Sequence, residues 1–186
     1  MEQVLDRARA RYGATPPTLD FVQAELANAY GAAGQHAKAE QLLRDGLERA
    51  RKQFGSADPR TAAAMGQLGM NLVQQRNWAE AEPLLRRALA IRQARLPDDW
   101  VTFDSRSLLG GLLLDRKIYA EAEPLLVSGY EGLQARAARI PARYEKRLAE
   151  AGARVVALYA AWGQNDKAEK WRARLSTATK PARPGP

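Results

Sequence analysis

Apolar and small residues recur along this chain of 186 residues at the spacing of amphipathic helices, and the pattern repeats. The stretch that begins at Leu26 recurs from Leu68, from Leu109 and, in a more divergent form, from Val155. The three spacings are 42, 41 and 46 residues. Each copy holds two helical stretches separated by a short break, so each copy predicts an antiparallel pair of helices.

Tandem helix pairs of this length predict an all-α fold, a right-handed α-solenoid of stacked antiparallel helix pairs. Because the repeat is already under way at the first residue, we expect a fragment of a longer protein or an array with an unusual first cap. Three prolines and a glycine among the last eleven residues predict disorder there. The expected division is a preceding second helix at 1–16, repeats at 17–58, 59–99, 100–141 and 142–175, the last with a shortened second helix, and a tail at 176–186.

Small residues recur where the two helices of a pair must cross closely. A larger side chain at these positions would push the helices apart. The positions are Ala27, Gly69 and Gly110 in the first helix of a pair, and Ala39, Ala81, Ala122 and Ala168 in the second.

This pattern resembles the tetratricopeptide repeat (TPR), in the 42-residue form of kinesin light chains. The matching residues in the first copy are Leu26, Ala27, Tyr30, Gly34, Ala39 and Leu43, and the stretch AEAEPLLRRALAIR from Ala79 is similar as well. The resemblance implies a TPR superhelix that binds proteins. HEAT-type repeats have a similar length and are the alternative, but the alanine and aromatic positions fit them poorly.

A narrower resemblance covers the third copy. The stretch from Trp100, TFDSRSLLGGLLLDRKIYAEAEPLLVSGYEGL, is similar to the terminal repeats of planctomycete-type bacterial Ser/Thr protein kinases. It implies that the chain is the C-terminal regulatory segment of such a kinase. The sequence itself contains no glycine-rich phosphate loop, no HRD and no DFG motif.

Composition excludes most catalytic chemistry. The chain has no cysteine and one histidine, which removes thiolate nucleophiles, disulfides and zinc-finger sites. His36 occupies a repeat position held by Trp78 and Tyr119 in the next copies, so we interpret it as a packing residue. We therefore predict no catalytic residue, no cofactor and no metal. With no membrane-spanning run and no leader sequence, we expect a cytoplasmic protein. A bacterial source is what the kinase-linked resemblance implies.

The first helix of each pair is expected to line a concave groove that binds a protein or peptide. Acidic residues toward its C-terminal end favour an extended or helical peptide with basic character at one end. The groove candidates are Phe21, Asn28, Gln67, Met70, Gln74, Asp104, Ser107, Asp115 and Glu150.

The net charge of +8 arises in the last third of the chain. Residues 132–186 carry twelve Lys and Arg against four Asp and Glu, whereas the residues before them are balanced. A solvated cap on the end of the solenoid is the main interpretation. An acidic protein or a membrane surface is the next, and nucleic acid bound through residues 132–174 comes after both. The basic-patch candidates are Arg136, Arg139, Arg143, Lys146, Arg147 and Arg154.

Overall fold

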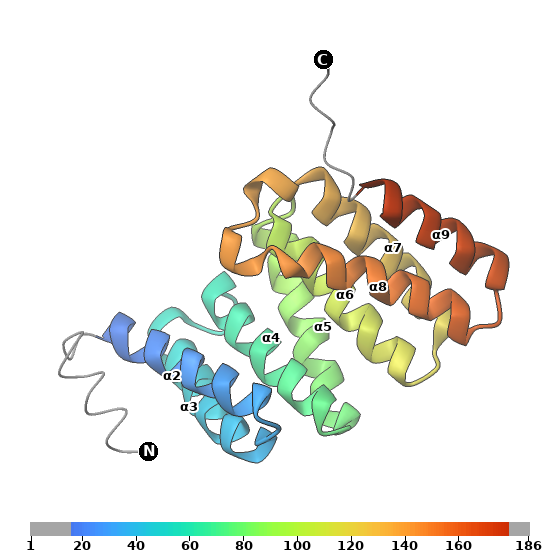
Figure 1. Cartoon of the computed structure of the whole chain (residues 1–186). Coiled ribbons are helices and arrows are strands. Elements are labelled where there is room, and N and C mark those ends of the chain that lie inside the picture. Colours follow the sequence, from blue (N-terminus) through green and yellow to red (C-terminus); the bar gives the residue numbers. More distant parts are fainter. Residues whose placement is uncertain (1–15, 179–186) are drawn as a thin grey trace. The chain divides into compact units, whose positions relative to one another are not determined.

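The computed structural model describes residues 16–178, and within that range every regular element is a helix (Figure 1). The chain forms two compact units, Met1–Arg95 and Leu96–Pro186. We call them unit 1 and unit 2. The predicted all-α class is therefore confirmed for the described residues.

Unit 1 contains two helix pairs. Its helices are α2 (Pro16–Ala32), α3 (His36–Phe54), α4 (Pro59–Gln74) and α5 (Trp78–Arg95). Each helix packs against the one that follows it in the sequence. The two pairs therefore stack through contacts between α3 and α4.

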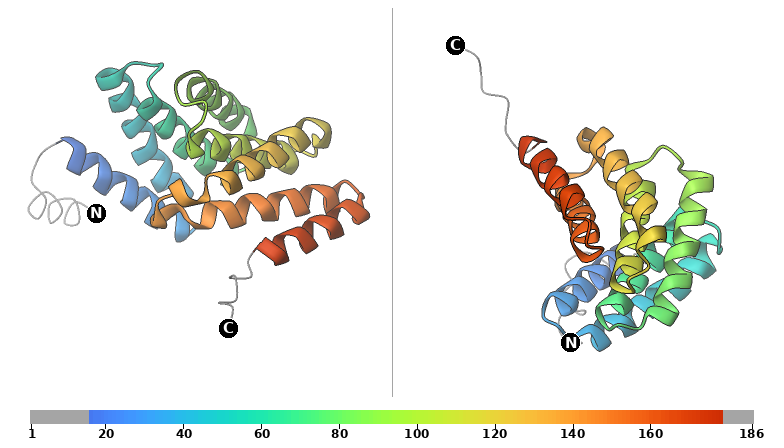
Figure 2. Two further views of the ribbon diagram at one scale, coloured as in Figure 1. Left: turned by 90° about the horizontal axis from the view of Figure 1, so that it is seen from above. Right: turned by 90° about the vertical axis from the view of Figure 1, so that its right-hand side faces the viewer.

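Unit 2 contains α6 (Trp100–Asp115), α7 (Tyr119–Ala135), α8 (Lys146–Ala161) and α9 (Asn165–Ala178). Two short 3₁₀ helices, η1 (Ala137–Arg139) and η2 (Ala142–Tyr144), connect α7 to α8. Helix α8 packs against both α6 and α7, and α9 lies beside α8 in both views of Figure 2. One face of α6 is thus covered by the next helix pair.

Short sequence signals determine where α4 and α6, each the first helix of a pair, begin. The Asp58 side chain accepts a hydrogen bond of 2.8 Å from the amide of Arg60, and Pro59 occupies the first helical position of α4. Asp99 caps α6 in the same way, through a bond of 3.0 Å from the amide of Val101. The acidic residues before these helices are therefore capping groups.

The turn inside each helix pair has the same backbone geometry. One residue with positive φ ends the first helix, and the next amide reaches back five residues to a helical carbonyl, as in a Schellman motif. Glycine holds this position in two turns, whereas Arg76 (φ 57°) and Lys117 (φ 60°) hold it in the others. The four amide-to-carbonyl pairs are Gln35 to Tyr30, Asn77 to Leu72, Ile118 to Leu113 and Gln164 to Tyr159.

The predicted crossing positions lie in the core. Ala39, Ala81 and Ala122 are completely inaccessible to solvent. A Cβ built on Gly69 would come within 2.9 Å of the Leu85 side chain, which shows how closely α4 and α5 approach. The predicted need for alanine or glycine at the crossings is therefore confirmed.

The ends of the chain depart in part from the expected division. The predicted helix before the first repeat lies outside the described residues, except that α2 already begins at Pro16. Helix α9 is the shortest α-helix described, with 14 residues, but it continues to Ala178. The expected tail from residue 176 is wrong at its start, because Ser176 and Thr177 bond to the carbonyls of Ala173 and Arg174. The rest of that tail lies outside the described residues.

Candidate functional site

A hollow of about 220 Å³ opens on unit 1 between α2, α3 and α4. Small side chains create it, because alanines on α2 and α4 and a glycine on α3 leave the space between these helices unfilled. Leu42, Leu43 and Phe54 give it apolar walls. The full lining is Gln23, Ala24, Leu42, Leu43, Gly46, Arg49, Ala50, Phe54, Arg60, Ala63, Ala64 and Gln67.

Polar groups form the rim of this hollow. Arg49 donates a hydrogen bond to the side-chain oxygen of Gln23, so one amide and one guanidinium lie side by side. The guanidinium of Arg60 lies 3.6 Å from the centre of the Phe54 ring and donates two bonds to Asp58. The side-chain and backbone hydrogen bonds from Arg60 lower the pKa of Asp58 to about 2. Asp58 therefore balances the charge of Arg60, and the Arg60 side chain forms part of the wall of the hollow.

The structure does not bring the predicted groove residues together in one place. Gln67 lines the hollow, and Met70 lies half-buried one turn further along α4. Four residues are exposed but do not line this hollow. They are Asn28, Gln74, Asp115 and Glu150. Phe21 belongs to α2, but its side chain lies outside the described part of the structure.

The predicted groove positions on α6 are wrong. Asp104 is 7% exposed and Ser107 is fully buried, so neither is open to a peptide. The cause is Arg154 of α8, whose guanidinium donates a bond of 3.0 Å to the Ser107 hydroxyl. Burial lowers the pKa of Arg154, while the charges of Glu150 and Asp104 raise it. Asp104 therefore balances an internal cation, and of the acidic groove candidates only Asp115 and Glu150 remain exposed.

Other residues of the hollow were missed from sequence. Arg49 and Phe54 lie on the second helix of a pair, whereas the prediction placed the groove on the first helices alone. One signal could have indicated the site, namely the alanine pair Ala63 and Ala64 opposite Ala24. Such a run of small residues leaves volume that the repeat does not fill.

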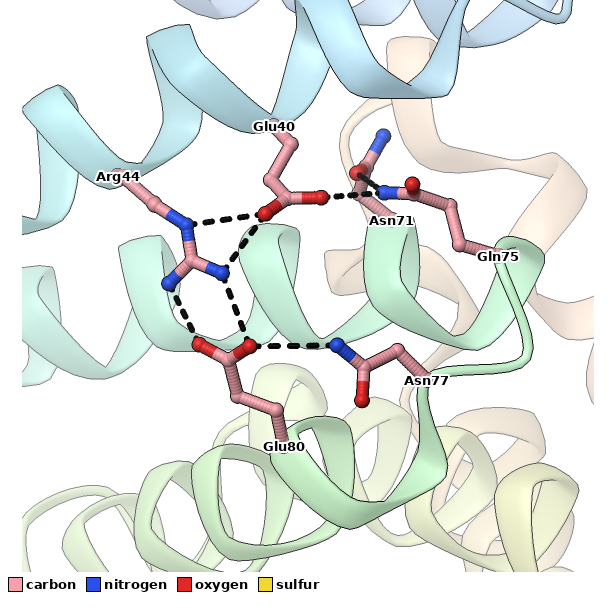
Figure 3. Close-up of polar contacts among 6 residues, drawn as sticks. All are labelled: Glu40, Arg44, Asn71, Gln75, Asn77 and Glu80. Carbon is pink, nitrogen blue, oxygen red and sulfur yellow. Dashed lines mark hydrogen bonds and ion pairs between the residues drawn. The ribbon is translucent and has the colours of Figure 1, made fainter.

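A polar network joins the two helix pairs of unit 1 (Figure 3). Arg44 of α3 donates to Glu40 on its own helix at 2.7 Å and to Glu80 of α5 at 2.5 and 2.9 Å. Gln75 donates to Glu40 at 2.6 Å, and Asn77 donates to Glu80 at 3.3 Å. The Arg44 hydrogen bonds lower the pKa of Glu80, and both carboxylates raise the pKa of Arg44. Each carboxylate has protein donors, so the network holds neighbouring repeats together.

Unit 2 has a contact at the matching place, with the charges arranged differently. Glu123 of α7 accepts a bond of 2.8 Å from the Tyr159 hydroxyl and one of 3.2 Å from Lys167 of α9. Burial, followed by the bond to Glu123, raises the pKa of Tyr159 to about 12. Lys167, which has the same repeat position as Glu80, is thus a cation where unit 1 has a carboxylate.

The basic-patch candidates divide into covered and exposed side chains. Arg154 is directed inward, with a side chain only 21% exposed, so its place in a surface patch is wrong. Arg136 is 18% exposed. Its guanidinium lies 4.1 Å from the centre of the Phe103 ring and donates to the carbonyl of Gly132 and to Asp98. The exposed members are Arg139, Arg143 and Lys146, with Arg147 partly covered.

Three further observations bear on chemistry. His36 begins α3, and its Nδ1 is buried without a hydrogen bond, as is the indole nitrogen of Trp78 at the same repeat position. Among residues 16–178, no group of three His, Cys, Asp or Glu side chains is placed to hold a metal ion. None of the helices described here has the length and apolar character needed to cross a membrane.

Comparison with known proteins finds one family match to part of the chain and several similar folds. The family model described as tetratricopeptide repeat matches residues 18–94. The solved structure of BtubC (BKLC) from P. vanneervenii is similar over 100% of this chain and 74% of its own, with a TM-score of 0.71 and 20% sequence identity. No curated protein matches the sequence.

Two crystal structures of a Podosopora anserina protein, described as a kinesin light chain with nearly identical TPR-like repeats, are similar at 24% identity. One covers 95% of this chain and 82% of its own with a TM-score of 0.69, and the other 99% and 86% with a TM-score of 0.68. The fold is therefore the TPR type of α-solenoid. None of these proteins is described as a kinase, so the kinase-linked resemblance of the third repeat stays a prediction, as does the cytoplasmic location.

Proposed function

We propose that this chain is a protein-interaction module without catalytic activity, and that the hollow of unit 1 holds a side chain of a bound peptide. TPR folds generally serve protein–protein interaction, because stacked helix pairs present extended concave surfaces. The hollow between α2, α3 and α4 is the single observation that supports a specific binding site on this molecule.

The size of the hollow decides what it can take. At about 220 Å³ it is smaller than the roughly 300–1,000 Å³ of pockets that hold whole small molecules. One bulky side chain of a polypeptide fits this scale better. The walls formed by Leu42, Leu43 and Phe54 favour an apolar side chain, because its burial removes apolar surface from water on both sides.

The rim favours an extended peptide around that side chain. The amides of Gln23 and Gln67 each carry donors and an acceptor, which match the N–H and C=O groups of a peptide backbone. Arg49 adds a cation beside Gln23. The preferred ligand is therefore a peptide with one large apolar residue and no basic residue next to it.

Filling the hollow tests the proposal. Peptides selected from a random display library on the wild-type chain would be titrated by fluorescence anisotropy against Ala63→Leu and Ala24→Leu, which narrow the hollow from opposite walls. We expect each variant to bind at least about tenfold more weakly, which corresponds to about 1.4 kcal/mol. Ala90→Leu, at an exposed position on α5 of the same unit, is the matched control and should bind like the wild type.

Urea melts of all variants accompany this experiment, so that loss of folding is separated from loss of binding. Selected peptides that bind Ala63→Leu and Ala24→Leu as tightly as the wild type would show that the site lies elsewhere.

A further inference from the structure

The connection between α7 and α8 is an addition to the repeat. It runs through residues 136–145 and contains η1 and η2, whereas the connection from α3 to α4 takes only residues 55–58. The short connection is sufficient to stack one helix pair on the next. The extra residues of unit 2 are therefore not needed for packing two pairs.

Aromatic contacts hold this added connection in place. The Tyr144 ring lies 5.2 Å from the Trp100 ring at the start of α6. The Arg143 guanidinium lies 4.9 Å from the centre of the Tyr144 ring. The cations of the connection are therefore presented from an anchored segment, which reduces the entropy lost on binding.

The same connection already binds one carboxylate of its own chain. Arg136 donates to the Asp98 carbonyl oxygen at 2.8 Å and also to its carboxylate, and Arg139 donates to that carboxylate at 3.3 Å. Asp98 is 71% exposed, and Arg139 is 68% exposed. The contacts of Arg136 and Arg139 with Asp98 show that the connection places two guanidinium groups around one carboxylate at the protein surface.

We propose that the connection surface, formed by Arg139, Arg143, Lys146 and Arg147, binds an acidic segment of a partner polypeptide. Arginine N–H groups match the two oxygens of a carboxylate. This surface belongs to unit 2 and is independent of the hollow in unit 1, so it adds a second kind of partner chemistry to the module.

The neighbouring groups favour an acidic polypeptide over nucleic acid. Stacking of bases needs open aromatic faces, but Tyr144 has Trp100 and Arg143 against it, and Phe103 has Arg136 and Arg106 against it. Carboxylates also lie beside these cations: Asp98 pairs with Arg139 at 3.3 Å, Glu150 pairs with Arg147 at 3.6 Å, and Glu145 stands next to Lys146 in the sequence. They interrupt a continuous phosphate track. A flexible polypeptide can turn individual carboxylates away from these acidic groups, whereas the regular phosphate backbone of a nucleic acid cannot.

Charge reversal tests the proposal with defined probes. A fluorescein-labelled octaglutamate peptide, a single-stranded DNA and a duplex DNA would be titrated at low and at physiological salt against the wild type and Arg143→Glu, Lys146→Glu. The control is Lys170→Glu, Arg172→Glu in α9, which removes two exposed cations of the same unit and changes the net charge equally. We expect octaglutamate to bind the wild type and the control, and to bind the connection variant about tenfold or more weakly.

A third variant, Asp98→Asn, removes the carboxylate that now occupies Arg139, so we expect it to bind octaglutamate more tightly than the wild type does. Equal loss in the connection variant and the control would overturn the proposal, because net charge alone would then explain binding. Tighter binding of either DNA than of octaglutamate at physiological salt would make this a nucleic-acid surface instead. Absence of octaglutamate binding at low salt would also overturn it.

Discussion

The backbone of Gly129 in α7 lies directly against the backbone of Ser107 in α6. A Cβ atom on Gly129 would stand 2.8 Å from the Ser107 nitrogen and 3.0 Å from the Phe103 carbonyl oxygen. Backbone atoms cannot move aside as a side chain can, so the two helices depend on a glycine at this crossing.

Gly129→Ala should therefore destabilise the protein by about 1–3 kcal/mol, although alanine is the better helix former. The matched control is Gly66→Ala in α4, where a Cβ would meet nothing within 4 Å. That variant should be neutral or up to about 1 kcal/mol more stable. Urea unfolding followed by circular dichroism measures both, and equal effects would show that the α6–α7 crossing tolerates separation.

The crossing in unit 1 offers a second test. Ala81 of α5 is completely buried, so Ala81→Leu should destabilise by about 1–3 kcal/mol through overpacking. Ala90→Leu on the exposed side of the same helix should stay within about 0.5 kcal/mol of the wild type. Denaturant melts distinguish the two, and a neutral Ala81→Leu would contradict the assigned packing of α4 on α5.

The turns with positive φ should be improved by glycine. Arg76 and Lys117 are exposed, and each holds a left-handed conformation that costs roughly 1–2 kcal/mol for a residue with a Cβ. Glycine removes that cost but gains freedom in the unfolded chain, so Arg76→Gly and Lys117→Gly should each stabilise by about 0.5–1 kcal/mol. Gly34→Ala, at φ 71°, should destabilise in the same thermal and urea melts. A loss of stability in both glycine variants would contradict this account.

The Arg44 network should make unit 1 sensitive to acid. Hydrogen bonds from Arg44 lower the pKa of Glu80 below its ordinary value of 4.5. The stabilising contribution is therefore present above that ordinary value and is lost as the pH falls through the lowered pKa of the folded state. Glu80→Gln should be less stable than the wild type at neutral pH, and the difference should shrink as the pH falls below 4.5 and through the lowered pKa of Glu80.

Urea midpoints measured across that pH range test this, with Glu121→Gln, an exposed glutamate in the first turn of α7, as the comparison. If the Glu80→Gln and wild-type midpoints fell in parallel with acid, the network would not be the source of the pH dependence.

Much of this architecture could be predicted from the repeat alone. The shared positions of Ala39, Ala81 and Ala122 indicate where helices cross, because only small residues allow two backbones to approach so closely. Asp58 before Pro59 indicates where α4 begins. These signals depend only on nearby residues, and corresponding signals recur in other copies of the repeat.

The candidate site could be predicted only in part, because it depends on contacts between copies. Asp104 and Ser107 have the same repeat phase as accessible positions in other copies, yet Arg154 of the following pair covers them. Phe54 and Arg49 line the hollow from a helix that the repeat rule assigns to the other side. Repeat phase predicts which face of a helix points inward, but it does not tell which side chain of the next pair reaches that face.

Contacts between consecutive helix pairs involve opposite charges at one repeat position in the two units. The order of the helix pairs therefore matters for how they pair. Glu80 receives Arg44 in unit 1, whereas the matching residue in unit 2 is Lys167, which pairs with Glu123. A shuffled protein with the last pair placed directly after the first would set Lys167 beside Arg44. Arg44 would then lose the Glu80 carboxylate and share Glu40 with a second cation, so repeats with the same backbone fold are still not interchangeable.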